Sequence, residues 1–501
     1  MGEPPLYPQI EPTTFDLIAI GTGLAECIVA AAASASGKTV LHLDTNPFYG
    51  SHYSSLSIPE LTSFLNSNST PPPPPPPFTA TATDSLDYLI VNLTTQPVYS
   101  DVEISCFCPE LLEKNSRKFN LDLCGPRVLF CADKSIDLML KSGASQYVEF
   151  KSIDASFVGD ENGKLWNVPD SRAAIFKDKS LSLMEKNQLM RFFKLVQGHL
   201  AATVVAGSAG GDGNGNENEN DEEESKAKIS EEDLERPFVE YLSKMRLPPK
   251  IKSIILYAIA MADYDQNDMG VCRDLLKTKD GIDRLALYQS SVGRFTNASG
   301  ALIYPIYGQG ELPQAFSRRA AVKGCLYVLR MPVTALLMEK DSGSYKGVRL
   351  ASGQDLFSQK LVLDPSFTLN SPSASPSDLL HDSFSFLSIR DIKGKVARGI
   401  YITRSSLKPD TPNFLADQHH SKVGGPPRTV MFDWAYTHSL TYAGQFDSIN
   451  FTLMPDGNLN YNDTLDAVVK LFQEMYPNEA YFSETTPPVN SEDDTELTLE
   501  T

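Results

Sequence analysis

The chain has 501 residues, 41% of them hydrophobic, and its 44 basic and 63 acidic side chains give a net charge of −19 at pH 7. That length predicts two domains with inserts between their elements. So acidic a balance argues against nucleic acid or an anionic membrane surface as the main partner and favours basic protein partners, although acidity also serves solubility.

Cysteine usage and the start of the chain indicate the compartment. The seven cysteines are odd in number and form no pair of CxxC spacings, so neither a disulfide framework nor a zinc site is indicated. The start of the chain lacks the basic and apolar regions of a signal peptide, and no apolar run approaches membrane-spanning length. We therefore expect a soluble cytosolic protein in a reducing compartment.

The first predicted elements are a strand, a glycine turn, a helix and a second strand. Residues 15–20 (FDLIAI) run into GTGLAEC, and small residues (IVAAAASASG) follow. A second apolar run, TVLHLD, ends at Asp44. This order predicts a βαβ unit of the dinucleotide-binding type.

The glycine turn departs from the GxGxxG fingerprint of that unit. Gly21 and Gly23 occupy the first two glycine positions, but Glu26 occupies the third. A glutamate adds bulk where helix and strand pack closely, and negative charge where a pyrophosphate would bind. Asp44 still stands where an acid would bind a ribose hydroxyl. The sequence therefore predicts the fold without a cofactor.

Two low-complexity segments interrupt the domains. Residues 66–84 are rich in proline and indicate a polyproline linker within the first domain, residues 1–150. Residues 206–233 are glycine-rich, then acidic, and are predicted to be disordered. They fall within a mainly helical second domain, residues 151–270, that begins with strands.

Strand signals return after the helical blocks, so residues 271–480 are expected to complete the first domain. An acidic tail, 481–501, follows. Residues 405–455 are expected to be irregular and the closing strands incomplete. The predicted fold class is α/β, with a cofactor-free Rossmann-like large domain of the kind that binds FAD or NAD(P) and a smaller all-helical domain.

No motif indicates catalysis. The chain has no HExxH, GxSxG or GxxxxGK[ST] sequence, and its seven histidines show no metal-ligand spacing. Two alternatives from other classes stay open on the residues. One is a flavin-dependent oxidoreductase, because the βαβ unit is shared. The other is an interaction module that offers its proline run to SH3-type grooves.

Three stretches resemble the family that contains GDP-dissociation inhibitors and Rab escort proteins. The first runs from GTGLAEC to NPFYG, the second contains SRKFNLDLCGPRVLF, and the third contains YPIYGQGELPQAF. The resemblance spans residues 15 to about 333, and the GELPQ-F element is its most specific part. It implies a FAD-like scaffold without flavin and a non-catalytic protein.

The resemblance implies binding to GDP-loaded Rab GTPases. The family's Rab-binding platform falls on Tyr49 of NPFYG, on Glu311 and Arg318 of GELPQAFSR and on Tyr327. A bidentate arginine, a carboxylate and a rigid aromatic ring suit such a surface. On the residues alone, a core position for Tyr49 and a mutual pair of Glu311 and Arg318 are favoured, and it is the resemblance that favours the binding surface.

The helical domain of relatives holds the prenyl group and, in escort proteins, docks on the α/β heterodimer of Rab geranylgeranyltransferase. The resemblance therefore implies a docking role for Phe238, as an aromatic anchor. Residues that would line a pocket for the geranylgeranyl lipid, but that suit an ordinary helical core equally well, are Leu189, Met190, Phe193, Ile254, Ile255 and Ile259.

Chain length, the two inserts, the PFVEYL start of a helix and Gln309 favour the escort branch, most like its plant members. The expected function is to present unprenylated Rab to the transferase and to shield the prenylated product, with only transient membrane contact and no nucleic acid. A GDP-dissociation inhibitor is the alternative within the family.

Overall fold

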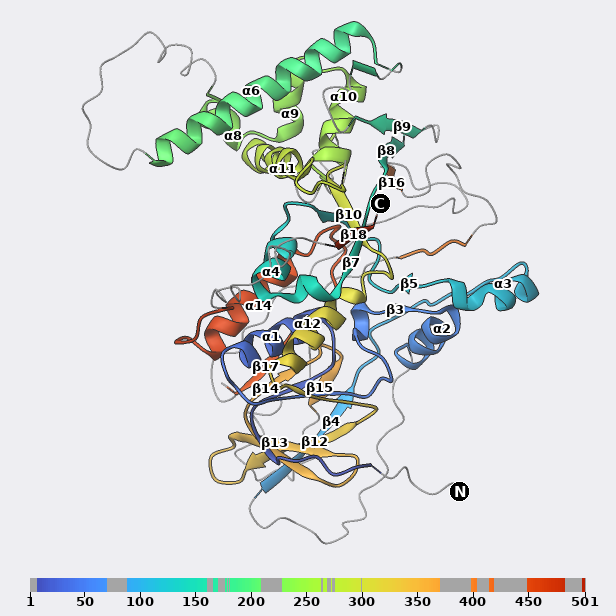
Figure 1. Ribbon diagram of the computed structural model, residues 1–501, viewed down its shortest axis with the longest axis vertical. Helices are drawn as coiled ribbons and strands as arrows, with labels where there is room; N and C mark the ends of the chain where they lie inside the picture. The colour runs from blue at the N-terminus through green and yellow to red at the C-terminus, as the bar shows by residue number, and fades with distance from the viewer. Residues whose placement is uncertain are drawn as a thin grey trace.

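The computed structural model shows a large lobe built on a sheet and a smaller lobe built of helices (Figure 1). Most of the predicted low-complexity segments 66–84 and 206–233, and much of 405–455 and 481–501, lies outside the described residues. The structure describes residues 7–69, 88–159, 165–169, 176–177, 179, 181–208, 228–262, 265–267, 272, 275–298, 300–369, 398–402, 414–418, 448–482 and 498–500.

The main sheet of the large lobe has nine strands: β1 (Thr14–Ile20), β2 (Val40–Asp44), β4 (Tyr88–Thr95), β11 (Leu326–Leu329), β12 (Val333–Glu339), β13 (Tyr345–Leu350), β14 (Asp355–Leu363), β15 (Phe367–Leu369) and β17 (Ile449–Phe451). Their order is β11-β2-β1-β14-β13-β12-β4-β15, with β17 paired to β14 outside this path. Strands β11, β2, β1, β14 and β17 pair in parallel, and the remaining pairs are antiparallel.

The two faces of β1 enter two different cores. Leu17 and Ala19 pack on the helical side, whereas Ile18 and Ile20 pack with the antiparallel strands. This alternation is what a strand buried on both faces requires. The helical side carries α1 (Leu24–Ala35), α4 (Lys134–Ser142), α12 (Glu311–Val322) and α14 (Asn462–Met475).

The predicted βαβ unit is present as β1, α1 and β2, and β1 pairs with β2 in parallel. Helix α1 consists mainly of alanine and aliphatic residues and is buried from its first turn to Ser34. A helix that is apolar on all sides needs cover on all sides, and here α12 and α14 lie against it. These contacts fix the position of α12, which carries two of the predicted binding residues.

Smaller sheets lie between the main sheet and the helical lobe. One has the order β18-β7-β10-β6, a second β16-β8-β9, and a third pairs β3 with β5. Their bounds are β3 (Ser55–Leu56), β5 (Leu121–Asp122), β6 (Leu129–Phe130), β7 (Glu149–Ser152), β8 (Ala155–Gly159), β9 (Leu165–Val168), β10 (Leu302–Pro305), β16 (Phe414–Gln418) and β18 (Thr498–Glu500). Short helices of the large lobe are η1 (Ser51–Tyr53), α2 (Ile58–Ser67), α3 (Pro109–Asn115), η2 (Ser116–Lys118) and η3 (Ala144–Tyr147).

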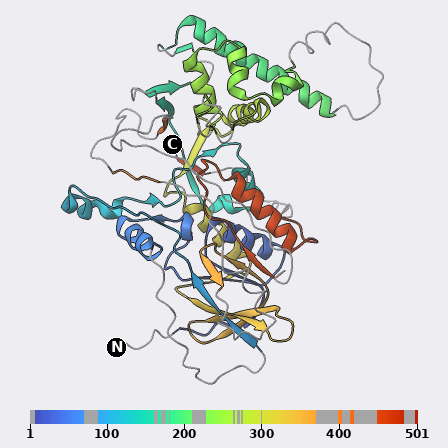
Figure 2. The ribbon, with the colours of Figure 1, turned by 180° about the vertical axis from the view of Figure 1, so that it is seen from behind.

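The helical lobe stands apart from the main sheet in both ribbon views, with α6 running along its outer side (Figures 1 and 2). Its helices are α6 (Leu183–Ser208), α8 (Glu231–Glu235), α9 (Phe238–Lys244), α10 (Pro249–Ser253), the π-helix η4 (Ile254–Ile259) and α11 (Thr278–Ser291). Helix α11 belongs to this lobe, because its apolar face completes the core of the lobe. It lies beyond the domain boundary that the sequence led us to expect at residue 270. None of the described helices is long and apolar enough to cross a membrane.

Candidate functional site

The glycine turn between β1 and α1 is closed by acidic side chains of the chain itself. Gly21 has a φ of +95°, and a Cβ at this residue would overlap the side chain of Asp364. A Cβ on Gly23 would overlap the carboxyl group of Glu26. The two glycines are therefore required by these close approaches, without any ligand.

Glu26 is buried, and its carboxyl group accepts a hydrogen bond from the hydroxyl group of Thr452. Burial, reinforced by the nearby carboxylate of Asp364, raises the pKa of Glu26 well above the usual range of a carboxyl group. The side chain thus occupies space beside the turn as a neutral acid at neutral pH.

Two further carboxylates surround the same turn. Asp44 accepts hydrogen bonds from the amide of Thr22 at 2.8 Å and from the amide of Asn46 at 2.7 Å. Burial outweighs these bonds and raises the pKa of Asp44 to about 6. Burial would also raise the pKa of Asp364, but His52, 3.4 Å away, and hydrogen bonds from Ser366 hold it below its usual range.

A dinucleotide does not fit this arrangement. Glu26 and Asp364 fill the space beside the turn, and Asp44 already uses both of its oxygens for hydrogen bonds within the chain. A pyrophosphate here would also meet carboxyl groups in place of the amide-lined cradle that the fingerprint normally provides.

The turn instead positions the loop that follows β2. Both the carbonyl oxygen and the hydroxyl oxygen of Thr22 accept a hydrogen bond from the amide of Gly50, each at 3.0 Å. The residue before Gly50 is Tyr49, which is half-buried, and its ring contacts the ring of Tyr327 on β11. Tyr327 in turn lies over His42, with 4.8 Å between ring centroids. Tyr49 thus lies at the edge of the core. Its ring packs against Tyr327, as a core residue would, but it is only half-buried, as a binding residue would be.

Helix α12 presents the charged residues of the predicted platform. The carboxylate of Glu311 accepts a hydrogen bond from the amide of Tyr307 at 3.0 Å, and burial, with some repulsion from Glu149, raises its pKa. Arg318 is exposed, and its guanidinium group lies over the ring of Tyr147, 5.2 Å from the centroid. The expected alternative that Glu311 and Arg318 pair with each other is wrong, because each has a different partner.

Glu311 and Arg318 are seven residues apart on α12, which places them on one face about 10 Å apart along the helix axis. The helix is fixed against α1 by Ser317, whose hydroxyl group lies 3.1 Å from the thiol of Cys27. Tyr147, which supports Arg318, was not singled out from the sequence. It belongs to the second resembling stretch, but nothing in its spacing indicates contact with residue 318.

A buried polar network holds the start of α12. Asp122 accepts hydrogen bonds from the hydroxyl group of Ser55 at 2.5 Å and from the amide of Gln309 at 2.9 Å. The side chain of Gln309 accepts from the hydroxyl group of Tyr461 at 2.7 Å and donates to the carbonyl of Arg127 at 3.1 Å. Gln309 therefore has a structural role just before Glu311.

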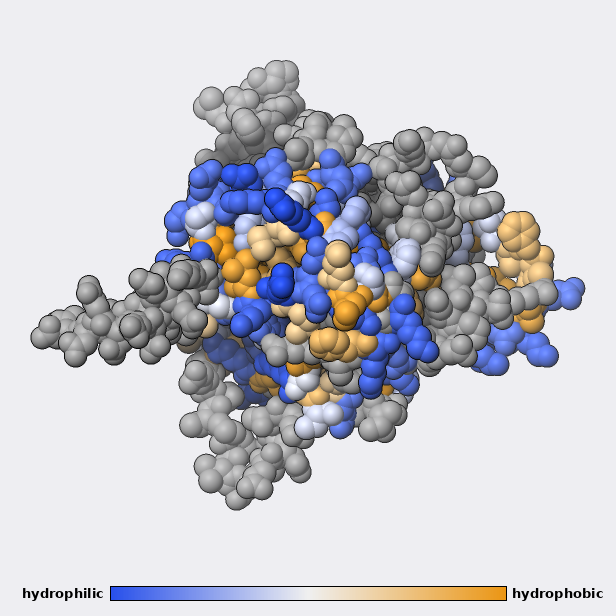
Figure 3. Space-filling view, turned by 90° about the horizontal axis from the view of Figure 1, so that it is seen from above, coloured by the Kyte–Doolittle hydropathy of each residue, from blue (hydrophilic) through white to orange (hydrophobic). Residues whose placement is uncertain are grey.

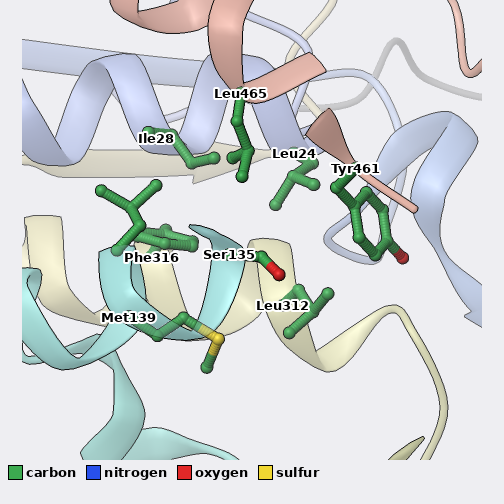
Figure 4. A pocket seen from close by; sticks show the side chains of 9 residues that line it. Leu24, Ile28, Ser135, Met139, Leu312, Phe316, Tyr461 and Leu465 are labelled. Atoms are coloured by element: carbon green, nitrogen blue, oxygen red, sulfur yellow. The ribbon is translucent and has the colours of Figure 1, made fainter. Parts of the chain in front are cut away.

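A small hollow lies inside the large lobe, between α1, α4, α12 and the start of α14 (Figure 4). Figure 4 shows mainly aliphatic and aromatic side chains pointing into it. Its lining residues are Leu24, Ile28, Ser135, Leu138, Met139, Leu312, Phe316, Tyr461 and Leu465. It is separate from the proposed prenyl-pocket residues, which belong to the helical lobe.

The prenyl-pocket candidates share the core of the helical lobe. Met190 and Phe193 are half-buried at its edge, and the four others, Leu189, Ile254, Ile255 and Ile259, are fully buried. The three isoleucines lie on the π-helix η4, a geometry that is rare and often found at functional sites.

Phe238 is also fully buried, and its ring packs so closely on Gly281 of α11 that a Cβ there would overlap it. An aromatic anchor for a partner needs an exposed ring, so this role requires α9 to move relative to α11. The predicted docking role of Phe238 stays a prediction.

The fold and site together define a protein with a Rossmann-like βαβ unit whose glycine turn is closed by the chain's own acidic side chains and is tied to the loop that carries Tyr49. A family model described as "GDP dissociation inhibitor" matches residues 11–78, 92–204 and 218–374 of this chain. The chain belongs to this family, which confirms the resemblance.

Individual proteins to which the chain is similar are consistent with this family. "Rab escort protein 1" of Arabidopsis thaliana is 49% identical, with 97% of each chain covered. "Rab proteins geranylgeranyltransferase component A" of Drosophila melanogaster is 30% identical over 79% of this chain and 65% of that protein. The crystal structure of the Rab GDI of Plasmodium falciparum covers 93% of this chain and 99% of its own, with a TM-score of 0.56 and 17% identity, which confirms the fold.

Proposed function

We propose that the chain is a Rab escort protein, a non-catalytic component of Rab geranylgeranyltransferase. It binds unprenylated Rab in the GDP form, presents it to the α/β heterodimer and shields the prenylated product on the way to membranes. The observation that carries this proposal is the near full-length identity of 49% to a plant escort protein. We place this activity in the cytosol.

The surface around α12 is the proposed Rab-binding platform: Tyr49, Glu311, Arg318 and Tyr327. Arg318 is exposed and its guanidinium group is held on the ring of Tyr147, so little side-chain freedom is lost when it pairs with a carboxylate. Tyr49 and Tyr327 form an aromatic pair with each other. Glu311, held by Tyr307, supplies an acceptor for a basic group.

The helical lobe is the proposed lipid-binding part. Each buried CH₂ group of a geranylgeranyl chain contributes about 0.8 kcal/mol, so masking the lipid is strongly favourable. The candidate residues are packed against one another, so the lipid has to separate helices to enter. The π-helix η4 supports this proposal, because π-helices are rare and often found at functional sites and the side chains of η4 face that core.

A GDP-dissociation inhibitor is the second candidate, because the matching family model and the similar solved structure carry that name. A titration of GDP-loaded, unprenylated Rab against the chain tests the proposal. Saturable binding of the unprenylated form supports an escort protein. Binding of the prenylated form alone supports an inhibitor.

A further inference from the structure

One segment of the large lobe, residues 101–118, projects beyond the sheet and its helices, and we call it the α3 projection. It contains α3 and η2 and stands out at the side of the molecule in Figures 1 and 2. Figure 3 shows hydrophobic side chains gathered at its outer end, beside hydrophilic ones. The exposed fractions are 98% for Phe107, 57% for Ile104 and 46% for Leu111. Apolar side chains so exposed and so close together mark a surface that another molecule covers.

Charges of both signs accompany these apolar residues. The projection carries four exposed acidic side chains, Asp101, Glu103, Glu110 and Glu113. Its cationic side chains, Lys114, Arg117 and Lys118, lie at the end of α3 and on η2. The exposed apolar side chains, with the carboxylates of Glu110 and Glu113 on α3, are complementary to a segment that carries apolar and basic side chains.

The foot of the α3 projection is continuous with the proposed platform. The side-chain amide of Asn120, two residues beyond η2, donates a hydrogen bond to the carbonyl of Tyr307 at 3.3 Å. The amide of Tyr307 donates to Glu311 at 3.0 Å, and the Tyr307 side chain is 59% exposed. An exposed aromatic residue therefore connects the projection to the start of α12.

We infer that the α3 projection is a second contact surface for the GTPase that occupies the platform. It takes a segment of that GTPase with apolar and basic side chains, covering Phe107 and pairing basic groups with Glu110 and Glu113. The inference rests on the proposed function, since the platform defines which partner lies nearby. The buried ring supplies affinity, and the carboxylates favour the correct orientation and speed association.

Two exposed cysteines of the projection allow this contact to be measured by their chemical reactivity. Cys106 and Cys108 flank Phe107 and are exposed, whereas Cys27, Cys124, Cys131 and Cys325 are buried. Alkylation of the full chain with a maleimide, read out peptide by peptide by mass spectrometry, measures their accessibility. Saturating GDP-loaded Rab is expected to slow the reaction of both exposed thiols at least about fivefold. Unchanged rates in a complex known to have formed overturn the inference.

Substitution provides the second measurement. Phe107→Ser is expected to weaken the affinity for GDP-loaded Rab about fivefold to tenfold without changing the melting temperature, because the ring is almost fully exposed. The paired change E110K and E113K is expected to slow association and to weaken its dependence on salt. The matched control is Phe176→Ser on the helical lobe, where 58% of the side chain is exposed and no change is expected.

The outcomes separate this inference from the proposed function. If the unsubstituted chain binds Rab and Arg318→Ala weakens binding while Phe107→Ser does not, the inference fails and the proposed function stands. If Phe107→Ser weakens only the affinity for the transferase, the projection serves that enzyme and the inference is again overturned. If the unsubstituted chain binds no Rab, both fail together.

Discussion

The ring of Tyr49 packs edge-on against the ring of Tyr327, with 5.7 Å between the two centroids. The contact joins the loop after β2 to the edge strand β11, which pairs in parallel with β2. The same loop is tied at Gly50 to Thr22 of the glycine turn. A turn that binds dinucleotides in related folds thus serves here to position an aromatic residue of the proposed platform.

Tyr49→Ala tests this contact. We expect it to weaken the affinity for GDP-loaded Rab about tenfold, because a rigid aromatic contact is lost and the loop loses its packing on Tyr327. Tyr49→Phe keeps the ring and is expected to retain most of the affinity. A titration by fluorescence or calorimetry measures both variants. Equal affinities of the Ala variant and the unsubstituted chain would remove Tyr49 from the platform.

Arg318→Ala tests the charged part of the platform. The side chain is exposed and stacks on Tyr147, so its removal is expected to leave the melting temperature nearly unchanged. We expect Rab affinity to fall about tenfold or more, and Arg318→Lys to restore little, because lysine cannot form a bidentate pair. Lys323→Ala, an exposed position just past the end of α12, is the control. A loss of similar size in the control would indicate a general effect of charge.

Glu26→Gln tests the closed turn through its pH dependence. Because the pKa of Glu26 is raised from 4.5 to about 8 in the folded state, the folded chain keeps, between these two pH values, a proton that the unfolded chain has released. The free energy of unfolding of the natural chain therefore falls as pH rises through this window. Glutamine cannot titrate, so the stability of the variant relative to the natural chain should increase with pH, by at most about 1.4 kcal/mol per pH unit. Denaturant unfolding at several pH values measures this difference, and two parallel curves would show that Glu26 does not titrate in this window.

Phe238→Ala and Phe238→Leu separate a core role from a docking role. Because the ring is fully buried against Gly281, the Ala variant is expected to lose about 3–5 kcal/mol of stability in the helical lobe. The Leu variant keeps most of the apolar volume and should stay folded while losing the aromatic anchor. Affinity for the transferase, with Rab affinity as the control, decides the role. Normal transferase binding by the folded Leu variant would leave Phe238 as a core residue only.

Much of this organisation could be predicted because it is local in the sequence. The βαβ unit follows from two apolar runs around a glycine turn, and the bulk and charge of Glu26 favour a turn without a cofactor. Asp364 could not be linked to that turn, because it lies more than 300 residues further along the chain and reaches Gly21 only through β14. Helical spacing likewise cannot tell a buried Phe238 from an exposed one, since only the packing of α11 decides its exposure.

The pairing of Arg318 with Tyr147 illustrates the same limit for the site. The resemblance placed Arg318 on a binding surface, but the residues alone suggested Glu311 as its partner. The helix repeat separates these two charges by two turns, while η3 brings Tyr147 beneath the guanidinium group. Tertiary contacts of this kind have no signal in local spacing.

Geranylgeranyl transfer to a GDP-loaded Rab by the purified transferase α/β heterodimer, with and without this chain, tests the central claim most directly. The account predicts that transfer depends on the added chain and that Arg318→Ala reduces it, because the enzyme receives Rab only through the platform. Transfer at the same rate without the chain, or no transfer although the chain binds prenylated Rab, would contradict the escort function.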